Sequence, residues 1–389
     1  MKKTVNLHQD DMTSCNWQYD NPVKIVFGEN ALNKLPGLSG AKKTLLVTTP
    51  GFTKRGVTKR ICQLLGKDNV FVFDGVQPNP SFDEIGSFGA ELDKLSVECI
   101  VALGGGSVID TAKALSVVLS CRVDKLSLRD LLAGKIDLKD KTILPIIAVP
   151  TTAGTGSEVT PFATIWDKEE KKKYSLEKPQ IYPRIAILDP VLTLSLPKKE
   201  TITAGLDALA HAFEAIWNRN ATPITDVYAI NALEIIFTAL PDTVGDMRNI
   251  TNRSRMMRAS LFSGLAMSQT RTALSHSISY PLTVHFGVPH GLACAFTIVS
   301  VFHLNRAYED GRFQKVAGFL KLRDVDVLEE LLVNFMELLR VRERVRAYLP
   351  SIKELMQLSS EMITSDRVKN NLAPVSKKEI LEILRKSLS

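Results

Sequence analysis

The stretch IVALGGGSVIDTAKAL, residues 100–115, joins a short apolar run to a helical pattern through three consecutive glycines. Similar runs, rich in β-branched residues, lie elsewhere in the first half of the chain: VKIVFG (23–28), TLLVTT (44–49), NVFVFDGV (69–76) and TILPIIAVP (142–150). Helical patterns lie between them, for example at 52–66 and 110–120. This alternation predicts βαβ units and a parallel sheet that is buried on both faces.

The alternation stops near residue 198, and long segments with a 3.6-residue apolar period follow. These segments span 202–217, 225–247, 254–269, 327–345 and 376–388. A chain of 389 residues is also too long for one ordinary hydrophobic core. We therefore expect two domains, an α/β domain over residues 1–198 and an all-helical domain over residues 199–389.

The composition excludes several classes of protein. Hydrophobic residues make up 45% of the chain and charged residues 23%, which is typical of a soluble globular protein. No apolar run reaches the roughly 18 residues of a membrane span, and the nearest, residues 291–302, indicates a buried helix. The net charge of +7 is spread along the chain and forms no nucleic-acid-binding module. We expect neither a membrane nor a nucleic acid as partner.

The first residues and the cysteines indicate a cytoplasmic protein. The start, MKKTVNLHQDDMTSC, has no apolar stretch behind its basic residues, unlike a secretory signal. The five cysteines are odd in number and widely scattered, so we interpret them as buried or idle thiols in a reducing compartment. They are Cys15, Cys62, Cys99, Cys121 and Cys294.

Two loops predict a phosphate-binding crevice. Gly104, Gly105 and Gly106 leave the backbone open to a ligand, and Ser107 is a candidate N-cap for a helix whose free N–H groups attract an anion. A tight turn that binds nothing is the alternative. The second loop, VPTTAGTGSEVTP (149–161), offers several hydroxyl donors after another predicted strand. Two such loops at the carboxyl ends of parallel strands favour a pyrophosphate site.

A carboxylate and three histidines predict a metal site in the helical domain. Asp207 and His211 are four residues apart in the apolar segment AGLDALAHAFEAI (204–216), so both project from one helix face. A surface pair or a satisfied core histidine is the alternative, but burying such a pair is costly unless it serves a purpose. His276 and His290 follow in small, apolar surroundings. This set suits a borderline divalent ion such as Fe²⁺ or Zn²⁺.

Four motifs in this order, GGGSVIDTAKA, PTTAGTGSEVT, DALAHAFEA and HFGVPHG, resemble the iron-containing (group III) alcohol dehydrogenases, and the resemblance covers nearly the whole chain. It implies a Rossmann-like first domain, a helical second domain and a dehydroquinate synthase-like architecture. It also implies that Asp207, His211, His276 and His290 hold the metal and that the NAD(P) pyrophosphate lies on Gly104–Ser107. The other implied cofactor positions are Thr49, Asp110, Thr151, Thr152 and Thr155.

Two positions depart from the family pattern. Many members carry a histidine where this chain has Tyr280, which either donates a hydrogen bond or a proton or only shapes the pocket. NAD-preferring members often have an aspartate where this chain has Thr49. That change removes repulsion of a 2′-phosphate, and Lys54 and Arg55 add positive charge nearby. We therefore predict that NADPH is used at least as well as NADH.

The resemblance implies a metal-dependent, NAD(P)H-linked alcohol dehydrogenase or aldehyde reductase, with homodimers common in the family. In such an enzyme the metal polarises the aldehyde oxygen and the nicotinamide delivers the hydride. Segments 160–176 and 275–296 are similar to the phosphonoacetaldehyde reductase branch, which forms 2-hydroxyethylphosphonate.

Positive charge near the predicted metal suits such a substrate. We expect Arg271, five residues before His276, to bind the phosphonate, with Lys171–Lys173 assisting. A structural ion pair and solvated lysines are the alternatives for these residues. Reduction of a generic short-chain aldehyde is the alternative function, and a lyase on the same fold or a non-catalytic sensor are more distant rivals.

Overall fold

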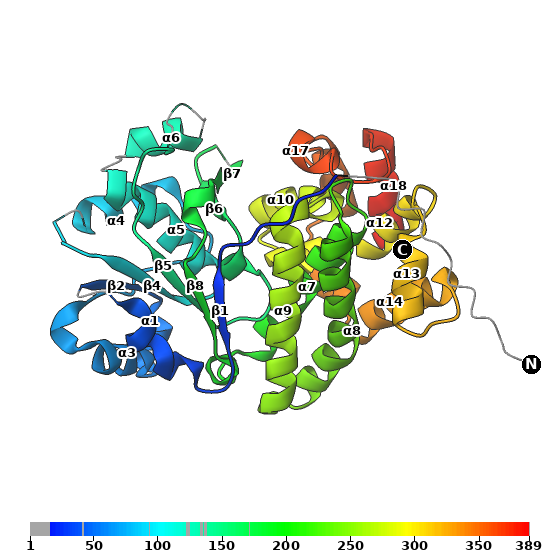
Figure 1. Ribbon diagram of the computed structural model, residues 1–389. Helices are drawn as coiled ribbons and strands as arrows, with labels where there is room; N and C mark the ends of the chain where they lie inside the picture. Colours follow the sequence, from blue (N-terminus) through cyan, green and yellow to red (C-terminus); the bar gives the residue numbers. More distant parts are fainter. Residues whose placement is uncertain are drawn as a thin grey trace, which may run out of the picture.

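The computed structural model describes residues 16–40, 43–92, 94–121, 125–132, 135, 138–170 and 172–388. Two predictions, the idle thiol of Cys15 and the role of Lys171, lie outside these residues. The chain forms two halves that lie side by side (Figure 1). We call them the α/β half, which precedes Lys198, and the helical half, which begins there.

The α/β half is built on a parallel sheet of six strands in the order β1-β8-β5-β4-β2-β3. Its strands are β1 (Lys24–Phe27), β2 (Thr44–Val47), β3 (Val70–Phe73), β4 (Cys99–Gly104), β5 (Ile146–Pro150) and β8 (Ile185–Leu188). β4 and β5 pair in register from Ile100 opposite Ile146 to Gly104 opposite Pro150. Both glycine-containing loops therefore leave the sheet side by side, as the sequence predicts.

Helices cover both faces of this sheet (Figure 1). On one face lie α1 (Leu35–Ser39) and α3 (Val57–Leu65), and on the other lie α4 (Phe82–Leu92), α5 (Gly106–Cys121) and α6 (Lys125–Leu132). Every residue of β4 is buried, which explains why its sequence is apolar without alternation. The helix expected over 52–66 is divided into α2 (Pro50–Lys54) and α3, because Gly56 between them adopts a left-handed conformation with φ 79°.

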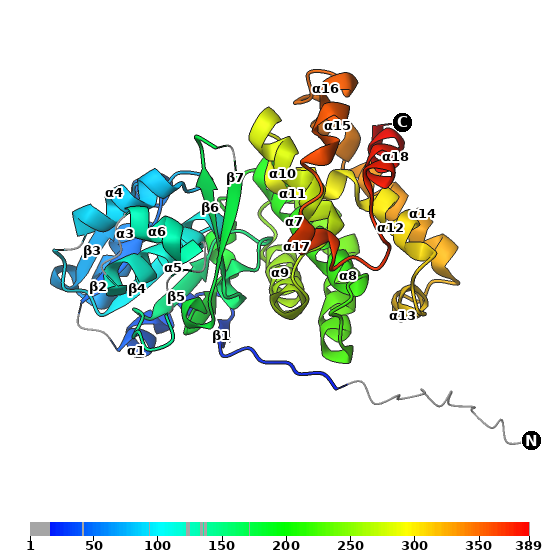
Figure 2. The same cartoon turned by 90° about the horizontal axis from the view of Figure 1, so that it is seen from above.

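An antiparallel hairpin, β6 (Phe162–Asp167) and β7 (Lys172–Glu177), stands apart from the parallel sheet. This hairpin was not predicted from the sequence, because β7 begins in a highly charged stretch that lacks the apolar pattern of a strand. Figure 2 shows the hairpin on the side of the α/β half that faces helix α10 (Leu274–Phe286). It thus brings residues of the first half toward the second.

The helical half is organised around α7 (Lys198–Ile216), which packs against α8 (Pro223–Gly245), α9 (Ile250–Thr270) and α11 (His290–Phe296). The remaining helices are α10, α12 (Ile298–Arg306), α13 (Arg312–Phe319), α14 (Val325–Leu338), α15 (Val341–Arg346), α16 (Ile352–Gln357), α17 (Ser365–Val368) and α18 (Lys377–Leu388). The helix expected over 291–302 is interrupted at Thr297, and the one over 327–345 at Arg340, whose φ is 52°. The fold confirms an α/β domain followed by helices.

Helix α8 is long and apolar enough to cross a membrane by length and composition, but 56% of its most apolar 18-residue stretch is buried inside the fold. It begins at a capping box in which Thr222 and Thr225 satisfy each other's backbone N–H groups. Its contacts with α7 and α9 account for its apolar sequence. The domain boundary at 198/199 stays our prediction, consistent with the start of α7.

Candidate active site

A cavity of about 580 Å³ lies between the two halves. It is lined by the glycine loops of the α/β half and by the predicted metal ligands of the helical half. The predicted site residues that line it are Thr49, Gly105, Gly106, Ser107, Asp110, Thr152, Thr155, Asp207, His211, Arg271, His276, Tyr280 and His290. Gly104 and Thr151 lie just outside the lining, where the N–H of Thr151 donates to the carbonyl of Gly104 at 3.0 Å.

The first glycine loop turns directly into α5. The N–H groups of Val108 and Ile109 donate to the carbonyl of Gly105 at 3.0 and 3.2 Å, so the helix begins at Gly106. The prediction that Ser107 is the N-cap is therefore wrong, since Ser107 lies in the first turn and its hydroxyl oxygen accepts from the N–H of Asn79. A β-carbon on Gly106 would lie 2.8 Å from the Thr155 side chain, so only glycine lets the two loops meet.

Hydrogen bonds hold the second loop against α5. Asp110, predicted as a cofactor residue, accepts from the hydroxyl of Ser157 at 2.7 Å and from the N–H of Thr164 at 2.9 Å. The fully buried Lys113 donates to the carbonyls of Ser157 and Phe162, each at 2.7 Å. Burial lowers the pKa of Lys113 to about 8, although Asp110 opposes the shift. This buried network holds the shape of the loop that faces the cavity.

The predicted metal ligands converge on one oxygen atom. The Nε2 atoms of His211, His276 and His290 lie 3.9, 3.7 and 3.9 Å from Oδ1 of Asp207. These residues come from α7, α10 and the first position of α11. Helices that are separate in the sequence thus present their side chains to a common point.

The charges of this set are strongly coupled: burial alone would lower the pKa of His276, but Cys294 and Glu214 raise it well above its ordinary value. Burial alone would raise the pKa of Asp207, but the histidines, His211 foremost, lower it below its ordinary value. Burial lowers the pKa of His211 and of His290, which keeps both imidazoles neutral. Oδ1 of Asp207 and Nε2 of His276 are buried and have no hydrogen-bond partner. Burying polar atoms without a hydrogen-bond partner costs free energy, and a divalent ion would bind both atoms. The residues therefore fit a metal.

Gly291 allows this convergence. A β-carbon on Gly291 would lie 2.1 Å from the carbonyl oxygen of Thr203 and 2.7 Å from Cβ of Asp207. The backbone of α11 therefore rests directly on α7, which brings His290 within reach of Asp207.

Glu214 is a buried carboxylate that the sequence analysis did not assign to the site. It accepts from Nδ1 of His276 at 2.7 Å and from the N–H groups of Ala273 and His276 at 2.7 and 3.0 Å. With Nδ1 held by Glu214, Nε2 is the ring atom of His276 that faces Asp207. Asp207, His211 and Glu214 occupy positions i, i+4 and i+7 of α7, and this spacing could have revealed Glu214.

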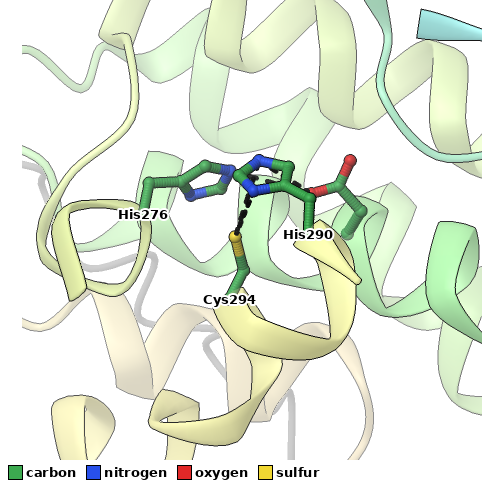
Figure 3. Close-up of side chains that lie close together, drawn as sticks. His276, His290 and Cys294 are labelled. Carbon is green, nitrogen blue, oxygen red and sulfur yellow. Dashed lines mark hydrogen bonds and ion pairs between the residues drawn. The ribbon is translucent and has the colours of Figure 1, made fainter. Parts of the chain in front are cut away.

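Cys294 is a buried thiol, as one of the expected alternatives had it, and it lies beside the histidines. It follows His290 by one helical turn, and its Sγ lies 3.8 Å from Nε2 and 3.9 Å from Nδ1 of His290 (Figure 3). Possible ligand atoms of Asp207, His276, His290 and Cys294 all lie within 4.8 Å of one another. Sequence spacing could have shown that Cys294 and His290 share a helix face.

Two cations, Lys173 and Arg367, meet at Tyr280 at the edge of the ligand set, and we call them the cation pair. Nζ of Lys173 lies 3.9 Å from the centre of the Tyr280 ring, and Nε of Arg367 donates to the Tyr280 hydroxyl at 3.3 Å. The same ring stacks on His290, with 6.2 Å between ring centres. Burial alone would raise the pKa of Tyr280, but Lys173 and Arg367 lower it to about 7, which reports a strongly positive environment.

The cation pair and Arg271 differ in their partners. Among the described residues, no carboxylate oxygen lies within 4.0 Å of the charged groups of Lys173 or Arg367. Arg271 instead forms an ion pair with Glu177 of β7. The structure therefore favours the structural interpretation of Arg271, since a carboxylate already neutralises its charge. Lys173 was expected to be solvated, but it lines the cavity, which corrects that expectation. Lys172 pairs with Glu170 and is largely exposed.

Comparison with known proteins identifies the chain's relatives. Residues 22–190 match the family described as iron-containing alcohol dehydrogenase, and residues 201–388 match the C-terminal part of the Fe-containing alcohol dehydrogenase family. The chain belongs to the iron-containing alcohol dehydrogenase family. It is accordingly an oxidoreductase that acts on CH–OH groups.

Individual relatives of this family act on different substrates. A 1-propanol dehydrogenase from Citrobacter freundii is 30% identical over 352 residues, which are 88% of this chain and 90% of the relative. A phosphonoacetaldehyde reductase from Streptomyces viridochromogenes is 33% identical over 70% of each chain. The crystal structure of sulfoacetaldehyde reductase from Bifidobacterium kashiwanohense with NAD⁺ superposes with a TM-score of 0.84 at 30% identity, over 96% of this chain and 99% of that one.

Replacing Glu214 with glutamine is expected to weaken metal binding by about 10- to 100-fold, the usual effect of losing a carboxylate that orients a histidine ligand. The amide keeps the size of the side chain but can no longer accept all three hydrogen bonds. Competition with a chromophoric chelator measures the affinity. An unchanged affinity in a folded variant would show that Glu214 does not orient His276.

Proposed function

We propose that the chain reduces a short aldehyde with an anionic head group, with phosphonoacetaldehyde as the substrate and NAD(P)H as the hydride donor. The cation pair carries this proposal, because Lys173 and Arg367 line the same cavity as the histidines, and within the described part of the chain no carboxylate oxygen lies within 4.0 Å of their charged groups. Charge-assisted hydrogen bonds from two such cations suit a phosphonate dianion. A generic short-chain aldehyde is the second candidate, and the similarity to a 1-propanol dehydrogenase supports it.

The two halves of the cavity would each hold one reactant. The backbone N–H groups at Gly105–Ser107, where α5 begins, would bind the cofactor pyrophosphate. Asp207, His211, His276 and His290 would hold a divalent ion, which we propose is Fe²⁺ and which supplies Lewis acidity toward the carbonyl oxygen. The role of the protein is to align the carbonyl carbon with the nicotinamide and to exclude water from the cavity.

Tyr280 would connect the head group to the reacting end of the substrate. Arg367 donates to its hydroxyl oxygen, so the phenol proton is directed away from Arg367. Stacking on His290 holds this hydroxyl beside the ligand set. We therefore assign Tyr280 a hydrogen bond to the substrate, while water and a cofactor hydroxyl remain sources of the proton that completes the alcohol.

The features around Thr49 support use of NADPH at least as readily as NADH. Thr49 lines the cavity and precedes α2, and it brings no negative charge to that position. Arg55 lies at the end of α2 with its guanidinium 4.3 Å from the centre of the Phe52 ring, so its charge is held near Thr49. We also propose that the chain forms a homodimer and acts in the cytoplasm.

Steady-state kinetics test this proposal. Purified protein reconstituted with Fe²⁺ is mixed with NADPH and phosphonoacetaldehyde, and loss of the reduced-nicotinamide absorbance is followed, with butanal in a parallel assay. We expect rapid oxidation of NADPH with the phosphonate and slow oxidation with butanal. The same assay with NADH measures cofactor preference, and a strong preference for NADH would refute that part of the proposal.

The rival functions give different results in this assay. Equal or faster reduction of butanal would assign a generic short-chain aldehyde as substrate and leave the cation pair without a role in selectivity. A lyase that uses NAD only as a bound catalyst would show no net oxidation of NAD(P)H. A sensor would bind the cofactor, which fluorescence detects, without turnover of any aldehyde.

A further inference from the structure

We propose that Cys294 is a ligand of the metal, binding through its thiolate together with Asp207, His276 and His290. This inference rests on the metal site of the proposed function and adds a sulfur atom to it. The step is an ordinary ligand exchange: the S–H bond breaks, a proton leaves to solvent, and a metal–sulfur bond forms with no change in oxidation state.

The position of Cys294 on α11 supports this role. It lies one turn after His290, so the same helix face carries both side chains. Its Sγ is fully buried, and it is nearly equidistant from the two ring nitrogens of His290, at 3.8 and 3.9 Å. The sulfur therefore lies beside His290 and close to the point where the other ligands meet (Figure 3).

The rest of the cluster independently indicates a cation at this point. Oδ1 of Asp207 and Nε2 of His276 are each buried without a hydrogen-bond partner. The ligand atoms of Asp207, His276, His290 and Cys294 lie within 4.8 Å of one another, a separation that small side-chain adjustments reduce to that of a coordination sphere.

Two sets of four ligands are thus available, and they share Asp207, His276 and His290. One set is completed by His211, which stacks on His276 with 4.7 Å between ring centres, and the other by Cys294. A thiolate makes the site softer than one built from oxygen and nitrogen alone, which raises its affinity for Zn²⁺ relative to the Fe²⁺ of the proposed function. Cys294 would therefore influence which metal this chain retains.

Cobalt substitution tests the proposal without relying on activity. The full chain is loaded with Co²⁺, and its absorption spectrum is compared with that of Cys294→Ser. We expect wild-type protein to show visible d–d bands and a near-ultraviolet thiolate-to-Co²⁺ charge-transfer band. The Cys294→Ser variant should keep the d–d bands and lose the charge-transfer band. Cys62→Ser on α3, far from the cluster, is the control and should retain both.

The outcomes separate this proposal from the metal site itself. Visible d–d bands without a charge-transfer band in wild-type protein would overturn the role of Cys294 and leave the histidine site intact. Absence of both bands would contradict the metal site and with it the proposed function. A charge-transfer band that persists in Cys294→Ser would assign the bound thiolate to another cysteine and would equally reject the proposal.

Discussion

Replacing Asp207 with asparagine is expected to abolish metal binding and to lower kcat/KM by about 10³-fold, since Lewis-acid assistance is worth several kcal/mol. The three histidine Nε2 atoms converge on one carboxylate oxygen, so the substitution removes the negative charge at the centre of the set while keeping the side-chain shape. Metal content by atomic absorption and aldehyde reduction measure the two effects.

The matched control for this variant is His285→Ala. His285 lies on α10 like His276, but its Nε2 pairs with Glu361 outside the cavity lining. Its metal content and kcat/KM should equal those of the wild type. If Asp207→Asn keeps its metal and its activity, the convergence of these side chains has another purpose.

The second large effect is expected from the cation pair. Replacing Arg367 with glutamine should lower kcat/KM for phosphonoacetaldehyde by about 10²-fold, because a hydrogen bond to a charged group contributes about 1.5–3 kcal/mol. For butanal the loss should be smaller, because this substrate loses only the effect of Arg367 on the Tyr280 hydroxyl. Lys173→Gln should act in the same direction, and the ratio of the two kcat/KM values is the measured quantity.

Neighbouring lysines provide matched controls for the cation pair. Lys172→Gln removes the adjacent charge on β7, which pairs with Glu170, and Lys369→Gln removes one that pairs with Asp366. Both should leave the substrate ratio unchanged. An equal loss for phosphonoacetaldehyde and butanal in Arg367→Gln would indicate a role in shaping the cavity rather than in recognising an anion.

Sequence patterns predicted the parts of the site that depend on local spacing. The glycine loops followed predicted strands, and β4 and β5 are neighbours in the sheet, so the crevice formed where expected. Asp207 and His211 share one face of α7, as their four-residue spacing indicated. The fourfold convergence with His276 and His290 was inferred from ligand chemistry and family resemblance, and the helix arrangement fits that inference.

Other parts of the site depend on tertiary contacts that no local pattern reveals. Lys173 and Arg367 are far apart in the sequence and meet only because a hairpin from one half faces α17 of the other. Arg271 is near His276 in the sequence, but its partner, Glu177, comes from that same hairpin. Likewise the helix breaks at Thr297 and Arg340 interrupt continuous apolar patterns, because the chain must turn there to pack.

If Lys173 recognises the substrate as proposed, the β6–β7 hairpin places substrate choice on a segment apart from the metal ligands. It pairs with itself rather than with the six-stranded sheet, and it carries neither a predicted metal ligand nor a glycine of the first loop. Its β6 strand is bonded to α5 through Phe162 and Thr164, so only changes in β7 would alter the charge presented to a substrate while the cofactor loops keep their framework. Such modularity would let one scaffold acquire new aldehydes through small steps, and it marks Lys172–Glu177 as the natural segment to diversify in directed evolution.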